Sequence, residues 1–169
     1  MRKLLQLCET PKDVKYGLLG VALYQRKGQD FSKEVNSLFI KMCIRGKNLK
    51  VAAEILSTYE NRLGAWTSPT AFQRLAVELA AQDGSGGAAL LTEALDVVTK
   101  KGVKVTAASA KLALKACVHE ADEALYTKAV AAIARVVDAS ALKALLASYP
   151  KPEAKVTAEL DVKTEDIKA

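Results

Sequence analysis

Three glycines recur along the chain at nearly equal intervals, and each one closes a segment of helical character. Gly28, Gly64 and Gly102 are spaced 36 and 38 residues apart, and each is followed by a short linker and a new apolar-patterned segment. A period of roughly 33 to 47 residues with two helices per period is typical of an α-solenoid. The sequence therefore predicts an all-α fold built from stacked antiparallel helix pairs.

Local signals predict where the helices begin and end. Thr10-Pro11 is expected to start a helix that ends at Lys27-Gly28, because Thr suits the N-cap, Pro the first helical position and Gly a left-handed C-cap. Gly17 and Gly20 lie inside this helix and indicate either local weakness or close approach of a neighbouring helix. Further helices are predicted over 33–45 and 49–62, from Ser68-Pro69, over 88–101 after a glycine-rich turn at 84–87, from Thr106, from Asp122, and over 140–148.

These segments predict one repeat domain followed by a tail. The domain spans 1–149, with repeats at about 32–67, 68–105 and 106–138, a partial repeat before 31, and a capping helix at 140–148. Residues 150–169 have mixed charge and no helical stripe, so they are expected to form an extended, charged, non-globular tail.

Chemistry-bearing residues are few and scattered. The three cysteines are unclustered, which favours reduced thiols over a disulfide framework, and the single histidine, His119, is expected to be a solvated turn residue rather than a general base. The run Gly84-Ser85-Gly86-Gly87 lacks the Lys-Ser/Thr of a phosphate-binding loop. No apolar stretch approaches the roughly 18 residues of a membrane span. We therefore expect no enzyme activity, cofactor, metal, small-molecule substrate or membrane span.

Positive charge is concentrated in the first third of the chain. Residues 1–50 carry eleven Lys or Arg and four Asp or Glu, whereas residues 51–149 carry ten of each. Basic surface of this kind favours contact with nucleic-acid phosphates, and ordinary solvated helix ends are the alternative interpretation. The candidate RNA-contacting cations are Lys33, Lys41, Arg45, Lys47 and Lys50.

The repeat phrases resemble those of the pentatricopeptide repeat family. Glu34-Val35-Asn36-Ser37-Leu38-Phe39 with Val51-Ala52-Ala53-Glu54-Ile55-Leu56 is similar to one motif of that family, and Thr70–Leu75 with Glu93-Ala94-Leu95 is similar to another. The linker Lys101-Gly102-Val103-Lys104-Val105-Thr106 is the most specific piece, and the resemblance covers roughly residues 12 to 138. It implies a right-handed solenoid related to tetratricopeptide-type repeats.

The resemblance also implies a class of partner. Family members that read RNA use a polar residue near the start of the first helix together with one at the repeat end. Asn36 and Gln73 match the helix-start position of the two repeats, and Ser68 and Thr106 match the corresponding repeat-end positions. Two fair repeats are too few for base-by-base recognition, so we expect contacts mainly to the RNA backbone.

The functional expectation is a non-enzymatic subunit of an organellar ribonucleoprotein. The resemblance suggests a mitochondrial ribosomal protein in the matrix that contacts rRNA through its N-terminal third and neighbouring protein subunits elsewhere, with the chloroplast as the other organelle. The alternative is a protein-only helical scaffold of another organellar complex. Trp66, the single tryptophan, is either a wedge between repeats, a base-stacking platform or a partner-binding anchor.

Overall fold

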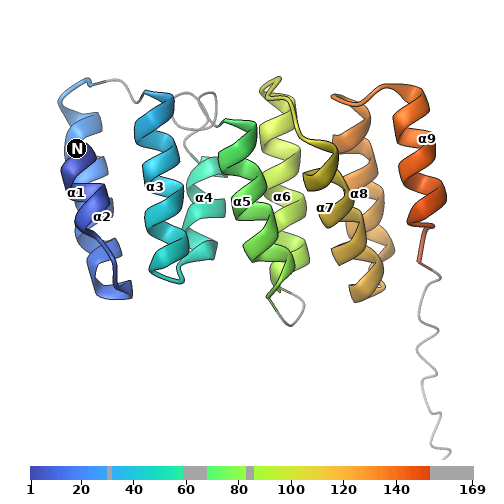
Figure 1. Ribbon diagram of the computed structural model, residues 1–169, viewed down its shortest axis with the longest axis horizontal. Coiled ribbons are helices and arrows are strands. Elements are labelled where there is room, and N and C mark those ends of the chain that lie inside the picture. Colours follow the sequence, from blue (N-terminus) through green and yellow to red (C-terminus); the bar gives the residue numbers. More distant parts are fainter. Residues whose placement is uncertain (30–31, 59–67, 83–85, 153–169) are drawn as a thin grey trace, which may run out of the picture.

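The described part of the chain is entirely helical. The computed structural model describes residues 1–29, 32–58, 68–82 and 86–152, and over these ranges it contains helices and turns but no strand. Figure 1 shows the helices standing side by side along the long axis of the molecule. Their bounds are α1 Arg2–Leu7, α2 Pro11–Arg26, α3 Lys33–Arg45, α4 Leu49–Thr58, α5 Pro69–Ala80, α6 Gly86–Lys100, α7 Ala107–Glu120, α8 Glu123–Ala134 and α9 Ala139–Ser148.

Hydroxyl N-caps set the start of helices α3, α5 and α7. The side chains of Ser32, Ser68 and Thr106 accept the backbone N–H of the residue three positions later, at 3.3, 3.1 and 3.2 Å. Each such cap stabilises a helix by about 1 kcal/mol. The caps lie 36 and 38 residues apart, the same spacings as the glycines, so α3, α5 and α7 begin at nearly regular intervals along the chain.

The helices form two rows. In the front row α1 packs on α3, α3 on α5 and α5 on α7; in the back row α4 packs on α6 and α6 on α8, while α2 packs on α3. The consecutive pairs α3/α4, α5/α6 and α7/α8 also pack together. The helix predicted over 140–148 is present as α9, which packs on α8.

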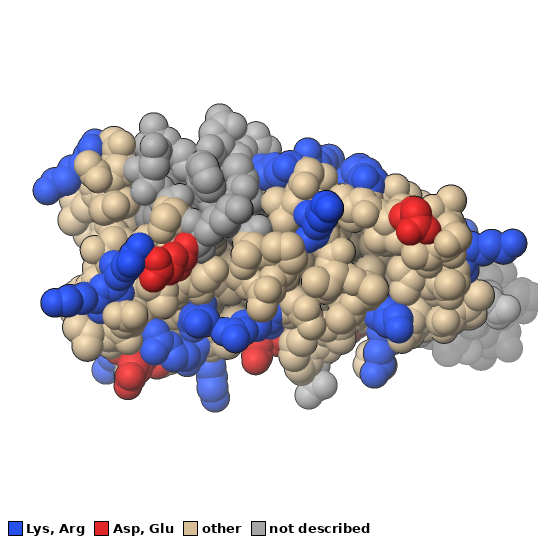
Figure 2. Space-filling model, turned by 45° about the horizontal axis from the view of Figure 1, so that its top comes forward, with Lys and Arg blue, Asp and Glu red and all other residues tan. Residues whose placement is uncertain are grey.

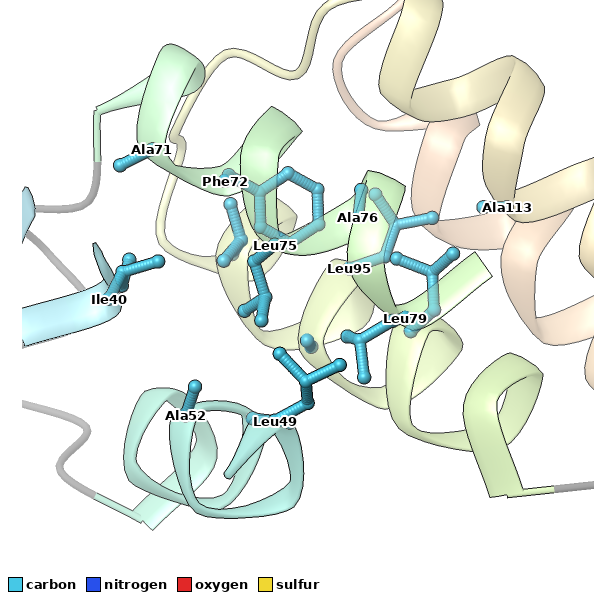
Figure 3. Close-up of a cluster of buried hydrophobic side chains, with 14 of the residues drawn as sticks. Ile40, Leu49, Ala52, Ala71, Phe72, Leu75, Ala76, Leu79, Leu95 and Ala113 are labelled. Carbon is cyan, nitrogen blue, oxygen red and sulfur yellow. The ribbon is translucent and has the colours of Figure 1, made fainter. Parts of the chain in front are cut away.

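One apolar core runs through both rows. Phe72, Leu75 and Leu79 of α5 are fully buried, and they are surrounded by Ile40 of α3, Leu49 and Ala52 of α4, Leu95 of α6 and Ala113 of α7 (Figure 3). Burying side chains of this size contributes roughly 1.5–3 kcal/mol each. The contacts hold the front and back rows together.

Glycines appear where helices or turns require them. A Cβ at Gly17 would collide with Met42 of α3, and one at Gly20 would collide with Leu4 of α1, so close approach is the correct interpretation for both. Gly28 and Gly102 both have φ of 69°, which confirms the left-handed conformation predicted for Gly28 and shows the same conformation at Gly102. Gly64 lies outside the described residues.

Several predicted boundaries differ from the structure. Helix α1 was not predicted, and Gly86 and Gly87 belong to the first turn of α6 rather than to a loop. His119 lies in the last turn of α7 rather than in the turn beyond it. The helix predicted over 49–62 is described as far as Thr58, and the tail is described only to residue 152.

Candidate nucleic-acid interface

The front-row helices carry a larger excess of positive charge than the other helices. The four front-row helices α1, α3, α5 and α7 carry eleven charged residues, eight Lys or Arg and three Asp or Glu, whereas α2, α4, α6 and α8 carry six and five. One of the three front-row acids, Glu34, is paired with Arg2 at 2.6 Å. Figure 2 shows Lys and Arg spread from end to end of one face, with few Asp and Glu among them.

Two front-row cations line two neighbouring pockets of the surface. A pocket of about 150 Å³ between α3 and α5 is lined by Lys41 and Arg74 together with the hydroxyl-bearing residues Ser37, Ser68 and Thr70. A second pocket of about 350 Å³ shares Lys41 and Arg74 and adds Gln6 and Arg45. We call the first of these the α3–α5 pocket.

Lys41 and Arg74 are both available to an anion. Both side chains are exposed. Within the described ranges, neither of them forms an ion pair. The hydroxyl groups of Ser68 and Thr70 in the α3–α5 pocket are additional hydrogen-bond donors for a phosphate oxygen.

The shared N-caps define which front-row residues are equivalent. Counting from Ser32, Ser68 and Thr106, the fifth residues are Ser37, Gln73 and Lys111, and the ninth are Lys41, Val77 and Lys115. Lys111 and Lys115 are exposed on α7, so the row of cations continues beyond the α3–α5 pocket.

This register corrects one predicted RNA contact. Asn36, predicted to match Gln73, is one residue out of step with it and is only 1% exposed. A side chain buried in the core cannot reach a bound RNA, so the assignment of Asn36 was wrong. Gln73 is half-buried, and its Oε1 accepts a hydrogen bond from the Thr106 hydroxyl at 3.2 Å. The structure therefore brings together the two residues that the resemblance pairs across a repeat boundary.

The remaining predicted cations have separate environments. Arg45 donates from Nη2 to the carbonyl of Leu5 at 2.9 Å and from Nη1 to that of Gln6 at 3.3 Å, so it ties the end of α1 to α3. Lys50 is paired with Glu54 at 3.7 Å.

Lys47 is exposed in the α3–α4 turn with φ of 52°. The side chain of Lys33, and Trp66 as a whole, lie outside the described residues.

Three exposed cations were not predicted as RNA contacts from the sequence. Arg74, Lys111 and Lys115 lie outside the basic first third of the chain, on which that prediction was based. Counting residues from each hydroxyl N-cap would have placed all three on the front row.

The buried thiols are poorly suited to chemistry. Burial raises the pKa of the Cys43 thiol to about 12, and burial likewise raises the pKa of Cys117. Both thiols are therefore held protonated and unreactive near neutral pH. His119 and Glu120 line a hollow of about 420 Å³ between α5, α6 and α7.

No group of three His, Cys, Asp or Glu side chains in the described part of the chain is placed to hold a metal ion. Among those residues, no helix is both long enough and apolar enough to cross a bilayer.

Comparison with known proteins found no match among protein-family models, curated proteins or solved structures. Function has therefore to be inferred from the residues themselves and from their arrangement.

Proposed function

We propose that this chain is a non-enzymatic, right-handed α-solenoid subunit of an organellar ribonucleoprotein, a mitochondrial ribosomal protein that contacts rRNA through its front-row helices. The observation that carries the RNA contact is the α3–α5 pocket, where Lys41 and Arg74 are exposed beside Ser37, Ser68 and Thr70. The organelle and the ribosome come from the resemblance to pentatricopeptide repeat proteins.

The chemistry of the pocket suits phosphate groups better than base edges. Lys and Arg neutralise phosphate charge and release counterions, while hydroxyl groups add directed hydrogen bonds. Reading bases would require one polar residue per repeat that is free to contact the base. Gln73 is instead engaged with Thr106, and the equivalent positions in the neighbouring repeats carry Ser37 and Lys111.

A protein-only helical scaffold is the second candidate, and one observation favours it. Among the described residues, five of the six exposed large apolar side chains lie on α1 and α2. Such clustering is typical of a protein contact. This surface and the α3–α5 pocket share no residue, so a protein contact there is compatible with RNA bound along the front row.

The test is the salt dependence of RNA binding by the full chain. Mitochondrial rRNA fragments would be titrated by fluorescence anisotropy against the unmodified protein and against a front-row variant. That variant carries Lys41→Ala, Arg74→Ala, Lys111→Ala and Lys115→Ala. A matched control carries Lys12→Ala, Lys15→Ala, Lys128→Ala and Lys143→Ala, which removes the same charge elsewhere. All eight side chains are exposed, so both variants should keep the helical circular dichroism of the parent.

The two variants have equal net charge, and we expect the salt dependence of their RNA binding to differ. Each lost single-strand phosphate contact lowers the slope of log K against log salt by about 0.7, so the front-row variant should lose up to about 3 units. The control should lose much less. Equal losses in both variants would mean non-specific attraction and would overturn the proposed site. Absence of binding would favour the scaffold, and failure to co-sediment with mitochondrial ribosomal subunits would overturn the ribosomal assignment.

A further inference from the structure

The first two helices expose an unusual amount of apolar surface. The large apolar side chains on them that reach solvent are Leu4, Leu7, Tyr16, Leu19 and Leu23. Three of these belong to α2, where Tyr16 is 67%, Leu19 60% and Leu23 51% exposed. Figure 1 places α1 and α2 together at one end of the molecule.

Helix α2 is apolar on two sides. On one side Val14 and Val21 are buried, and Gly17 lies close to Met42 of α3. On another side Tyr16, Leu19 and Leu23 follow one another at i, i+3 and i+7, which places them in a single line along the helix. The first side packs against α3, while the side chains of the second are each more than half exposed.

A cation lies at each end of this line. Lys12 precedes Tyr16 by four residues and Arg26 follows Leu23 by three, so Lys12, Tyr16, Leu19, Leu23 and Arg26 share the spacing of a coiled-coil seam. We call these five residues the α2 outer line. Both cations are exposed, and within the described ranges neither forms an ion pair.

The acid within α2 does not neutralise the line. Asp13 is the only acid in α2, and its carboxylate accepts the backbone N–H of Thr10 at 2.8 Å and of Glu9 at 3.1 Å. These hydrogen bonds satisfy backbone donors ahead of the helix. The cations of the α2 outer line therefore remain available to an external partner.

We propose that the α2 outer line binds a single amphipathic helix of another protein, one with apolar residues along its seam and a carboxylate at each end. Lys12 and Arg26 are fourteen residues apart, about 21 Å along a helix. The partner carboxylates must have a similar separation, close to four helical turns. Apolar contact supplies affinity, and the two charge pairs fix the register.

Charge disfavours pairing of the line with a second copy of itself. A symmetric antiparallel pair would bring Lys12 against Arg26 at both ends, and a parallel pair would bring each cation against its own counterpart. Like charges in such positions are destabilising. An anionic bilayer fits less well than a helix, because membrane-surface helices carry their cations on the polar face, whereas these two are in line with the apolar residues.

The experiment uses the full chain and designed peptides. One labelled helical peptide of about twenty residues carries Glu, Leu, Leu, Leu and Glu at the coiled-coil spacing; a second has Lys in place of Glu. The apolar variant is Leu19→Gln with Leu23→Gln, matched by Val77→Gln, an exposed apolar residue on α5. The charge variant is Lys12→Glu with Arg26→Glu, matched by Lys128→Glu with Lys143→Glu.

The α2 outer line predicts a charge-swap pattern in fluorescence anisotropy. The unmodified chain should prefer the Glu-ended peptide, and the apolar variant should weaken binding at least about tenfold while Val77→Gln leaves it unchanged. The charge variant should reverse the preference to the Lys-ended peptide, whereas its control should not. Equal binding of both peptides by all variants would overturn the proposal.

Two further measurements distinguish the other occupants. Vesicles of phosphatidylcholine with about a quarter phosphatidylserine would test an anionic bilayer, and sedimentation would test self-association. If either interaction is abolished by the apolar variant while peptide binding is absent, the assignment to an acidic helix is wrong. RNA titration of the same apolar variant separates this proposal from the proposed RNA contact, because the apolar substitutions leave the front-row cations unchanged.

Discussion

Replacing Asp96 by Asn is expected to destabilise the fold, because this carboxylate joins two back-row helices. From α6, its Oδ1 accepts a hydrogen bond from Arg135 Nη1 at 2.6 Å, and its Oδ2 pairs with Lys100 Nζ at 2.7 Å. Arg135 is the C-cap residue of α8 and also donates to the Thr99 hydroxyl at 3.3 Å. The cluster therefore fixes the position of α8 against α6.

The size of the effect follows from exposure. Asp96 is buried, and hydrogen bonds to charged groups contribute roughly 1.5–3 kcal/mol each. The side chains of Arg135 and Lys100 are 38% and 60% exposed, so both can return to water when the carboxylate is lost. We therefore discount the combined effect and expect Asp96→Asn to lower the free energy of unfolding by about 2 kcal/mol.

The destabilisation should depend on pH. Burial acts to raise the pKa of Asp96, but the hydrogen bonds from Lys100 and Arg135, followed by their charges, outweigh it and leave the pKa below its usual value. A depressed pKa in the folded state stabilises the fold above the unfolded pKa, about 3.9 for Asp, and this stabilisation is lost as pH falls through the folded value. The difference between the two proteins should therefore shrink below about pH 4.

Urea unfolding followed by far-ultraviolet circular dichroism, at constant ionic strength, measures this difference. Glu93→Gln is the matched control, because Glu93 is exposed on the same helix. Its effect should stay within about 0.5 kcal/mol. If Asp96→Asn cost no more than this control, or cost the same in acid as at neutral pH, the reasoning about the charged cluster would be refuted.

Three other changes test separate parts of the fold. Gly102→Ala should cost about 1–2 kcal/mol in urea unfolding, because φ is 69° there although no atom lies within 4 Å of the added Cβ; an unchanged midpoint would contradict the left-handed cap. Arg45→Ala should speed amide hydrogen exchange in α1 by releasing the carbonyls of Leu5 and Gln6, and α1 protection equal to the parent would argue against this tie. Cys43, with its pKa of about 12, should resist iodoacetamide in native buffer and react in urea, as read by mass spectrometry; equal rates would show that it is accessible.

The sequence predicted those helices whose signals are local. Helix α3 spans Lys33–Arg45 as expected, because Ser32 caps it and Gly46 follows it. Helix α5 starts at Pro69 after the Ser68 cap, also as expected. In both cases the determining interaction lies within three or four residues of the helix end, so it can be recognised without the tertiary structure.

Elements held by distant contacts could not be predicted in this way. Helix α1 has only six residues, too few to be stable alone. It is held by burial of Leu5 and by the guanidinium of Arg45, forty residues away. Asn36 was misassigned because it was placed from the family pattern alone: Phe39, Ile40 and Cys43 follow it at i+3, i+4 and i+7, so it lies on the side of α3 that packs into the core.

Which cations share a surface also depends on packing rather than on chain position. The sequence shows a positive first third, but the structure divides those cations among different tasks: Lys41 faces the α3–α5 pocket, Arg45 ties α1 to α3, and Lys12 and Arg26 end the α2 outer line. A total charge cannot distinguish these roles. Because the pocket belongs to front-row helices and the outer line to α2, RNA and an acidic helix could bind one molecule at once. Occupying one surface should then leave the affinity of the other unchanged apart from long-range charge effects that salt screens.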